Sequence, residues 1–120
     1  MKFTESLKKN FQFRYVYNKG KSFANRQLVL YCVKNGTNDN RLGISVSKKV
    51  GKSVVRSRVT RLIRESYRNM EVDVKRGYSF VLIARVPTAT ADYHEIEKSV
   101  KHLFKKQQLF INETKNETKK

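Results

Sequence analysis

The sequence is poor in the residues that build disulfide frameworks, zinc sites and membrane spans. It has one cysteine, Cys32, one proline and no tryptophan in 120 residues. A single cysteine excludes an intrachain disulfide and a multi-cysteine zinc site. No apolar run approaches the roughly 18 residues that a transmembrane helix needs, and residues 1–9 lack the apolar core of a signal peptide. We therefore expect a soluble, cytoplasmic protein with no membrane partner.

Acidic residues are also scarce. There are 10 Asp and Glu against 27 Lys and Arg, which gives a formal net charge of +17. Such an excess of one sign opposes compaction by self-repulsion and indicates a polyanionic partner, nucleic acid before an anionic membrane surface. The length fits one domain. We assign residues 1–110 to a single RNA-binding domain and residues 111–120, which are polar from Asn112 onward, to a disordered basic tail.

Hydrophobic periodicity predicts an α+β fold. We expect helices over residues 6–18, over 53–69 with Ser53 as the N-cap, and from 91 or 92 onward with Asp92 as the cap. The strands are expected over 27–34, 41–47 and 79–85, and a short strand over 21–24 is only weakly indicated. The order is helix, three strands, helix, strand, helix, which predicts helices packed on a mixed four-stranded sheet in an α/β sandwich.

The strongest functional signal is a basic segment, residues 48–68. It carries one carboxylate, Glu65, and eight cationic side chains: Lys48, Lys49, Lys52, Arg56, Arg58, Arg61, Arg64 and Arg68. Like charges on one helix face are unfavourable unless an anion spans them, and arginine binds phosphate through two parallel hydrogen bonds. We interpret this segment as a nucleic-acid contact rather than a solvated basic face.

A second signal is a surplus of aromatic residues on the first predicted helix. Phe13 and Tyr17 lie four apart and so share a helix face, while Val29 and Tyr31 share one face of the following strand. Opposed across a groove, with a small, polar floor from Gly43, Ser45 and Ser47, these side chains would suit unpaired nucleotides. Ordinary core packing is the alternative interpretation.

Catalytic patterns are missing from the sequence. It contains no paired-carboxylate spacing, nucleophile elbow or glycine-rich phosphate loop. The two histidines, His94 and His102, lie eight residues apart on the last predicted helix and are interpreted as surface residues; Cys32 is interpreted as a buried apolar residue. We expect neither catalytic nor metal-ligating residues in this chain.

Three segments resemble the protein subunit of bacterial ribonuclease P. They are Arg26–Tyr31 (RQLVLY), Arg41–Gly51 (RLGISVSKKVG) and Arg56–Glu65 (RSRVTRLIRE), and the similarity covers roughly residues 4–108. The chain departs from the usual family pattern at three places: Lys52 and Ser57 stand where asparagine is usual, and Thr60 stands where lysine is frequent.

The resemblance implies a defined role. The family's protein binds a large catalytic RNA, and together they remove the 5′ leader from precursor tRNA, with catalysis by the RNA subunit and Mg²⁺ held mainly by that RNA. The positions matching the family's leader-binding cleft are Phe13, Tyr17, Val29 and Tyr31, beside Ser45; the basic helix matches the part that contacts the RNA subunit. The implied partners are this RNA and precursor tRNA, with no obligate protein partner.

Two other functions fit parts of the sequence. A ribosomal or other structural RNA-binding protein would have the same size and charge, but it would have less use for an aromatic cleft that binds a flexible single strand. A self-sufficient nuclease is disfavoured because the sequence offers no pattern of catalytic acids or paired histidines.

Overall fold

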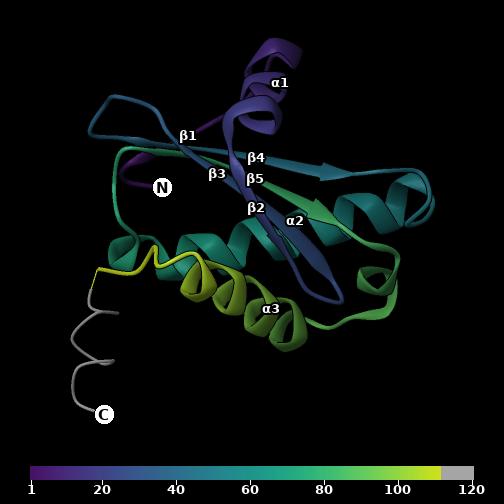
Figure 1. Ribbon diagram of the computed structural model, residues 1–120. Helices are drawn as coiled ribbons and strands as arrows, with labels where there is room; N and C mark the ends of the chain where they lie inside the picture. Colours follow the sequence, from purple (N-terminus) through teal and green to yellow (C-terminus); the bar gives the residue numbers. More distant parts are fainter. Residues whose placement is uncertain (112–120) are drawn as a thin grey trace.

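The computed structural model describes residues 1–111 and arranges them as helices on both faces of one mixed sheet (Figure 1). The strands are β1 (Thr4–Ser6), β2 (Lys21–Ala24), β3 (Leu28–Lys34), β4 (Asn40–Val46) and β5 (Tyr78–Ala84). The α-helices are α1 (Asn10–Lys19), α2 (Ser53–Met70) and α3 (Tyr93–Lys106), and two 3₁₀ turns are η1 (Glu71–Asp73) and η2 (Val86–Thr90).

The sheet has the strand order β1-β4-β5-β3-β2, so β5 is its central strand. β5 pairs parallel with β4 and antiparallel with β3. The predicted α+β sandwich and the weakly indicated strand β2 are confirmed, but the predicted strand count of four is wrong because β1 adds a fifth. β1 pairs parallel with β4; with three residues it is too short to show a hydrophobic period.

The first helix is shorter than predicted, and β1 is the reason. The expected helix over 6–18 begins only at Asn10, because the preceding chain pairs with the sheet. The Leu7 amide donates a hydrogen bond to the Leu42 carbonyl, 3.0 Å away, which extends that pairing beyond Ser6. Tertiary pairing therefore overrides local helix propensity here.

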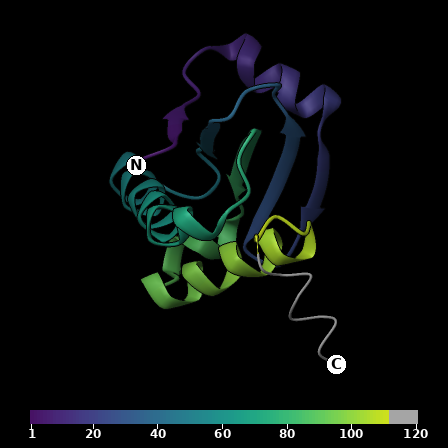
Figure 2. The same cartoon turned by 90° about the vertical axis from the view of Figure 1, so that its left-hand side faces the viewer.

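One face of the sheet is covered by α2 and α3 together (Figures 1 and 2). Val59, Ile63 and Tyr67 recur every four residues along α2, so they form one stripe, and all three are completely buried. Phe80 from β5 and Phe104 from α3 meet within this layer, with ring centroids 4.9 Å apart. This is the main hydrophobic core.

The other face is crossed by α1 alone, which lies above the sheet in Figure 1. Among residues 1–111, the buried hydrophobic cluster on this side consists of Leu7, Val16 and Val81. The aromatic side chains of Tyr17 and Tyr31 pack against them but keep part of their surface exposed. The thin cover leaves parts of this sheet face accessible on both sides of the helix.

The two predicted helix caps differ in outcome. Asp92 caps α3 as expected: its carboxylate accepts from the Glu95 amide (2.8 Å), and Glu95 accepts from the Asp92 amide (2.9 Å). Ser53 was expected to cap α2, but it is the first helical residue, and the cap position is held by Lys52 without a side-chain hydrogen bond. The basic helix therefore begins with no side-chain cap.

The N-terminal segment is fixed to the end of α2 by a buried carboxylate. Glu71 is 3% exposed and accepts hydrogen bonds from the backbone amides of Lys2 (2.8 Å) and Phe3 (3.0 Å). Burial acts to raise the pKa of Glu71, but the hydrogen bonds from the Thr4 hydroxyl and these amides lower it overall. This contact holds β1 at the edge of the sheet.

No helix in residues 1–111 combines the length and the apolar character that crossing a bilayer requires. The predicted disordered tail, 111–120, falls outside the described residues except for Ile111. The Ile111 amide donates to the Asp73 carbonyl at 2.9 Å.

Candidate nucleic-acid interface

Strand register arranges the open face of the sheet in rows beneath α1. Gly43, Val81 and Tyr31 are register partners on β4, β5 and β3 and form the middle row. Toward the C-terminal end of β4 the next row is Ser45, Ile83 and Val29; in the other direction the row is Arg41, Ser79 and Val33. Because α1 packs on the middle row, it divides this face into two halves.

The predicted aromatic residues do come together on the half that contains Ser45. The rings of Tyr17 and Tyr31 meet edge-on with centroids 5.0 Å apart, and Phe13 lies 6.5 Å from Tyr17. All three rings are partly exposed. Burial raises the pKa of the Tyr17 hydroxyl, and the neighbouring Ser45 side chain partly offsets this, so Tyr17 stays neutral and can donate a hydrogen bond.

The floor of this cleft is smaller than the sequence predicted. Gly43 was expected to leave open space, but it lies beneath the Phe13 ring: a Cβ added at Gly43 would lie 2.5 Å from Phe13 Cε2. Ser47, the other expected floor residue, lies beyond the end of β4 and is exposed. Phe13 therefore packs α1 against the sheet. The accessible part of the cleft is formed by Tyr17, Tyr31 and Ser45.

The basic segment forms a second surface on the other side of β4. An open groove runs between β4 and α2, with Ile44 and Val46 on the strand side. The helix side of this groove is lined by Ser53, Arg56, Ser57, Thr60, Arg61 and Arg64. Lys48, Lys49 and Lys52 are exposed in the connection between β4 and α2, so positive charge surrounds the C-terminal end of β4.

Comparison with known proteins identifies the family of the chain. The model of the family "Ribonuclease P" matches residues 1–108. The chain belongs to the ribonuclease P protein family. It is 57% identical over 101 residues to the "Ribonuclease P protein component" of Clostridium botulinum (83% of this chain, 91% of the relative), and 57% identical over 114 residues to that of Clostridium acetobutylicum (93% and 96%).

Solved structures of ribonuclease P proteins have the same fold. The Staphylococcus aureus protein superimposes with a TM-score of 0.82 at 38% identity, covering 88% of this chain and 96% of that one. The Thermotoga maritima protein gives 0.75 at 28% identity, covering 82% and 93%. Membership of the ribonuclease P family makes the chain a component of an endoribonuclease that works with an RNA partner and processes tRNA.

Within the ribonuclease P fold, the predicted arginines of α2 differ in what they contact. Arg58 donates from its guanidinium to the carbonyls of Ala89 and Ala91, joining α2 to η2. Arg56 Nε donates to the Gly51 carbonyl at 3.2 Å. Arg68 forms a two-point contact with Glu65, at 3.0 and 2.6 Å, which raises the pKa of Arg68 and lowers that of Glu65.

Arg61 and Arg64 are the arginines of α2 that remain available. Both are exposed, and within residues 1–111 neither forms an ion pair or a side-chain hydrogen bond. They lie three residues apart on the groove side of α2. The sequence pattern could not distinguish them from Arg58, because η2, which supplies the carbonyls for Arg58, lies far along the chain.

The cysteine and the two histidines of this ribonuclease P protein do not form a reactive cluster within residues 1–111. Cys32 is buried, and burial raises the pKa of its thiol to about 12, so it remains a protonated thiol in the core. His94 and His102 are exposed on α3, as predicted. Among residues 1–111, no three His, Cys, Asp or Glu side chains converge in a way that could hold a metal ion.

Sequence reasoning missed two residues that position the interface. Asn40 is completely buried at the start of β4; its amide donates to the Lys75 carbonyl (3.0 Å), and its Oδ1 accepts from the Tyr78 amide (3.0 Å). Glu71 was also unassigned. The one local signal for the role of Asn40 is its position, an asparagine at the start of a strand after a turn-rich connection. The role of Glu71 has no local signal, because its hydrogen-bond partners, Lys2 and Phe3, lie at the other end of the sequence from α2.

Proposed function

We propose that this protein binds the catalytic RNA subunit of ribonuclease P and the 5′ leader of precursor tRNA, and that it assists cleavage of the leader to give the mature tRNA 5′ end. The RNA subunit carries out catalysis, and the complex works in the cytoplasm. Family membership and the arrangement of two RNA-compatible surfaces around the end of β4 support this proposal.

The leader is assigned to the cleft at Tyr17, Tyr31 and Ser45. The observation that carries this assignment is the tyrosine pair, which is joined edge-on at 5.0 Å yet keeps part of both rings exposed. Phe13 and Val29 border the same half of the sheet. Partly exposed aromatic faces accept unpaired bases by stacking with little sequence preference, which suits leaders of varied sequence.

The RNA subunit is assigned to the groove face of α2 and to the lysines that precede it. Arg61 and Arg64 provide the phosphate contacts on the helix, with Lys48, Lys49 and Lys52 beside them. Arg56, Arg58 and Arg68, which also belong to the predicted set, already donate to protein groups. They contribute long-range positive potential and a fixed helix position more than direct contacts.

Magnesium belongs, in this proposal, mainly to the RNA subunit of the holoenzyme. Bound there, Mg²⁺ supplies a metal-activated water and stabilises the charge that develops at the phosphate. The chain's part is to bind and orient the two RNAs. Its positive side chains also offset repulsion between the leader and the RNA subunit, which lowers the magnesium concentration that the complex needs.

A ribosomal or other purely structural RNA-binding role is the alternative, and leader dependence separates the two. Tyr31→Ala removes the ring, whereas Tyr31→Phe keeps it. We expect Tyr31→Ala to lose about 1–3 kcal/mol of binding free energy for precursor tRNA, as for one unstacked base. Mature tRNA and the isolated RNA subunit should bind the variant as they bind the parent protein.

The measurement compares the affinities of both variants for precursor tRNA with a long leader, a short leader and no leader, together with their melting temperatures. Equal loss for every RNA, accompanied by a lower melting temperature, would mean that Tyr31 only supports the core. A parallel assay should find that the parent protein restores cleavage of precursor tRNA by the isolated RNA subunit at low magnesium. Failure to do so would favour the structural role.

A further inference from the structure

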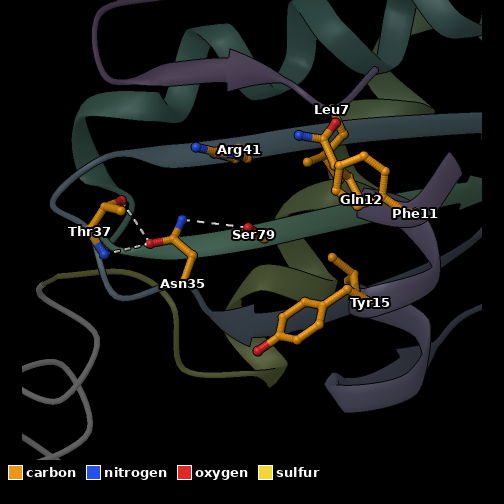
Figure 3. Close-up of a pocket in the computed structure, with 9 residues that line it drawn as sticks. Leu7, Phe11, Gln12, Tyr15, Asn35, Thr37, Arg41 and Ser79 are labelled. Atoms are coloured by element: carbon orange, nitrogen blue, oxygen red, sulfur yellow. Dashed lines mark hydrogen bonds between the residues drawn. The ribbon is translucent and has the colours of Figure 1, made fainter. Parts of the chain in front are cut away.

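A second hollow lies on the opposite side of α1 from the leader cleft. It has a volume of about 350 Å³, within the range of small-molecule pockets. Figure 3 shows Phe11 and Tyr15 on the α1 side, and Arg41, Asn35 and Ser79 from the strands and the connection after β3. We call this site the α1 back pocket.

The back pocket is geometrically separate from the leader cleft. Phe11 and Tyr15 each precede a cleft residue, Phe13 or Tyr17, by two positions, which is about 200° around a helix. On β4, Arg41 and Ser45 face the same way but lie on either side of Gly43, where the Phe13 ring sits. Helix α1 therefore stands between the two sites.

The walls on the helix side are aromatic and open to solvent. Phe11 is 62% exposed and Tyr15 is 52% exposed, so neither ring is needed for the core. The Lys9 ammonium lies 6.0 Å from the Phe11 ring centroid, which brings a positive charge to the rim. Two adjacent exposed rings beside a cation provide a platform for a planar, anionic ligand.

Two amide side chains, Asn35 and Gln12, line the back pocket, and the group that they leave free is a hydrogen-bond donor. The Asn35 oxygen already accepts from the Thr37 amide (2.9 Å) and hydroxyl (2.8 Å), and the Asn35 amide donates to the Asp39 carbonyl (3.0 Å). The Gln12 oxygen accepts from the amides of Lys8 and Lys9, which leaves its NH₂ group free to donate. Asn35 is therefore occupied, and Gln12 can only donate.

Arg41 supplies the charge. Its guanidinium forms no ion pair or hydrogen bond within residues 1–111, and none of the residues lining the pocket is acidic. Its register partner on β1, Glu5, lies outside the lining and is not within ion-pair distance. A site with aromatic walls, donor groups and one unpaired arginine selects a ligand that is planar, rich in acceptors and negatively charged.

We propose that the α1 back pocket binds one unpaired nucleotide of a single-stranded RNA. The base lies against Tyr15 and Phe11, and the phosphate contacts Arg41. A net charge of +17 favours RNA over an apolar peptide as the occupant, because a peptide would leave Arg41 buried without a counter-charge. The nucleotide can come from the precursor leader or from the RNA subunit.

The test measures binding of a short, labelled oligouridylate to the full chain and to four variants. Tyr15→Ala removes the platform, Tyr15→Phe keeps the ring, and Arg41→Gln removes the phosphate contact. Lys98→Gln removes the same charge from α3, in the opposite layer, where Lys98 is exposed. We expect Tyr15→Ala to weaken binding about 5- to 100-fold, Tyr15→Phe to bind like the parent, and Arg41→Gln to lose more than Lys98→Gln.

Three results would overturn the proposal. These are unchanged binding by Tyr15→Ala, equal losses for Arg41→Gln and Lys98→Gln, or equal losses for Tyr15→Phe and Tyr15→Ala. The melting temperatures of all four variants should match that of the parent protein, because Tyr15, Arg41 and Lys98 lie outside the core. Repeating the Tyr15→Ala measurement with the RNA subunit alone and with precursor tRNA identifies the source of the nucleotide. The Tyr31 variants test the leader cleft separately, so the proposal for one site can be refuted while the proposal for the other stands.

Discussion

The two faces of the sheet are formed by the same strands but differ in how they are covered. The face beneath α2 and α3 has completely buried side chains such as Ile63, Phe80 and Phe104, whereas the face beneath α1 leaves Tyr17 and Tyr31 partly exposed. Most of the buried core thus lies on one side, and the surface that we propose for RNA binding lies on the other. A single helix across a sheet gives enough packing to hold its own position and leaves a site on each flank.

The strongest test of this division is to truncate a large side chain in the main hydrophobic core, beneath α2 and α3. Phe104 is fully buried against Phe80 and Tyr67. We expect Phe104→Ala to lower the free energy of unfolding by about 3–5 kcal/mol, because it removes transfer free energy and leaves a cavity. Urea unfolding measures this loss. Tyr15→Ala, on the thinly covered face, serves as the comparison, and a loss of similar size there would contradict the division.

A smaller effect is expected from the carboxylate that connects the N-terminal segment to the end of α2. Glu71→Gln weakens the contact with the Lys2 and Phe3 amides and should cost about 1–3 kcal/mol. Because the folded-state pKa of Glu71 lies below its ordinary value of 4.5, the carboxylate's stabilisation is complete above that pH and is lost as the pH falls through the folded pKa.

Unfolding experiments across pH 3–7 test this sign. The parent protein should lose stability on acidification more steeply than Glu71→Gln, so the difference between the two narrows at low pH. A difference that is constant with pH would mean that the Glu71 charge has no part in the contact. Glu5→Gln provides the control, because Glu5 is exposed and its carboxylate forms no ion pair within residues 1–111.

The smallest effects on stability should separate the arginines within α2. Arg58→Ala leaves the Ala89 and Ala91 carbonyls without their donor, and we expect a loss of about 1–2 kcal/mol in unfolding free energy. Arg61→Ala and Arg64→Ala should leave the melting temperature unchanged. Affinity for the RNA subunit falls as salt rises, and each variant should make this fall less steep. For every phosphate contact removed, the magnitude of the slope of log affinity against log salt should decrease by about 0.7–0.9.

Filter binding at several salt concentrations, combined with thermal melting, distinguishes the two kinds of arginine. If Arg61→Ala and Arg64→Ala bind the RNA subunit unchanged at every salt concentration, the groove face of α2 is not the contact surface. If Arg58→Ala melts like the parent, its hydrogen bonds to η2 do not stabilise the fold.

Local patterns predicted much of this molecule, and long-range partners explain what they missed. The alternation of residues 41–47 in β4, the four-residue spacing in α2 and the Asp92 cap are properties of short segments, and the structure confirms them. Strand β1, the cover over Gly43 and the carbonyl partners of Arg58 depend on contacts between residues distant in the sequence. The helical period of α2 also predicts Leu62 on the core side; Leu62 is partly buried and packs against the main core.

For the candidate sites too, local patterns predicted which side chains share a face but not which elements meet. Phe13, Tyr17 and Tyr31 could be grouped because helix and strand periods fix which side chains share a face. The two-residue period of a strand puts Arg41 on the same face as Gly43 and Ser45. That Arg41 and Tyr15 line one pocket depends on where α1 crosses the sheet. No local pattern encodes that crossing position; it is set by the fit of the Phe13 ring over Gly43.

The order of the strands has a consequence for synthesis on the ribosome. Strand β5 is the last strand in the sequence, but it lies in the centre of the sheet, between β3 and β4, which do not pair with each other. A nascent chain that ends before Tyr78 can form only the β2–β3 hairpin and the short β1–β4 pair. We therefore expect such chains to stay unfolded and protease-sensitive, and folding to complete only after the central strand and α3 have left the exit tunnel.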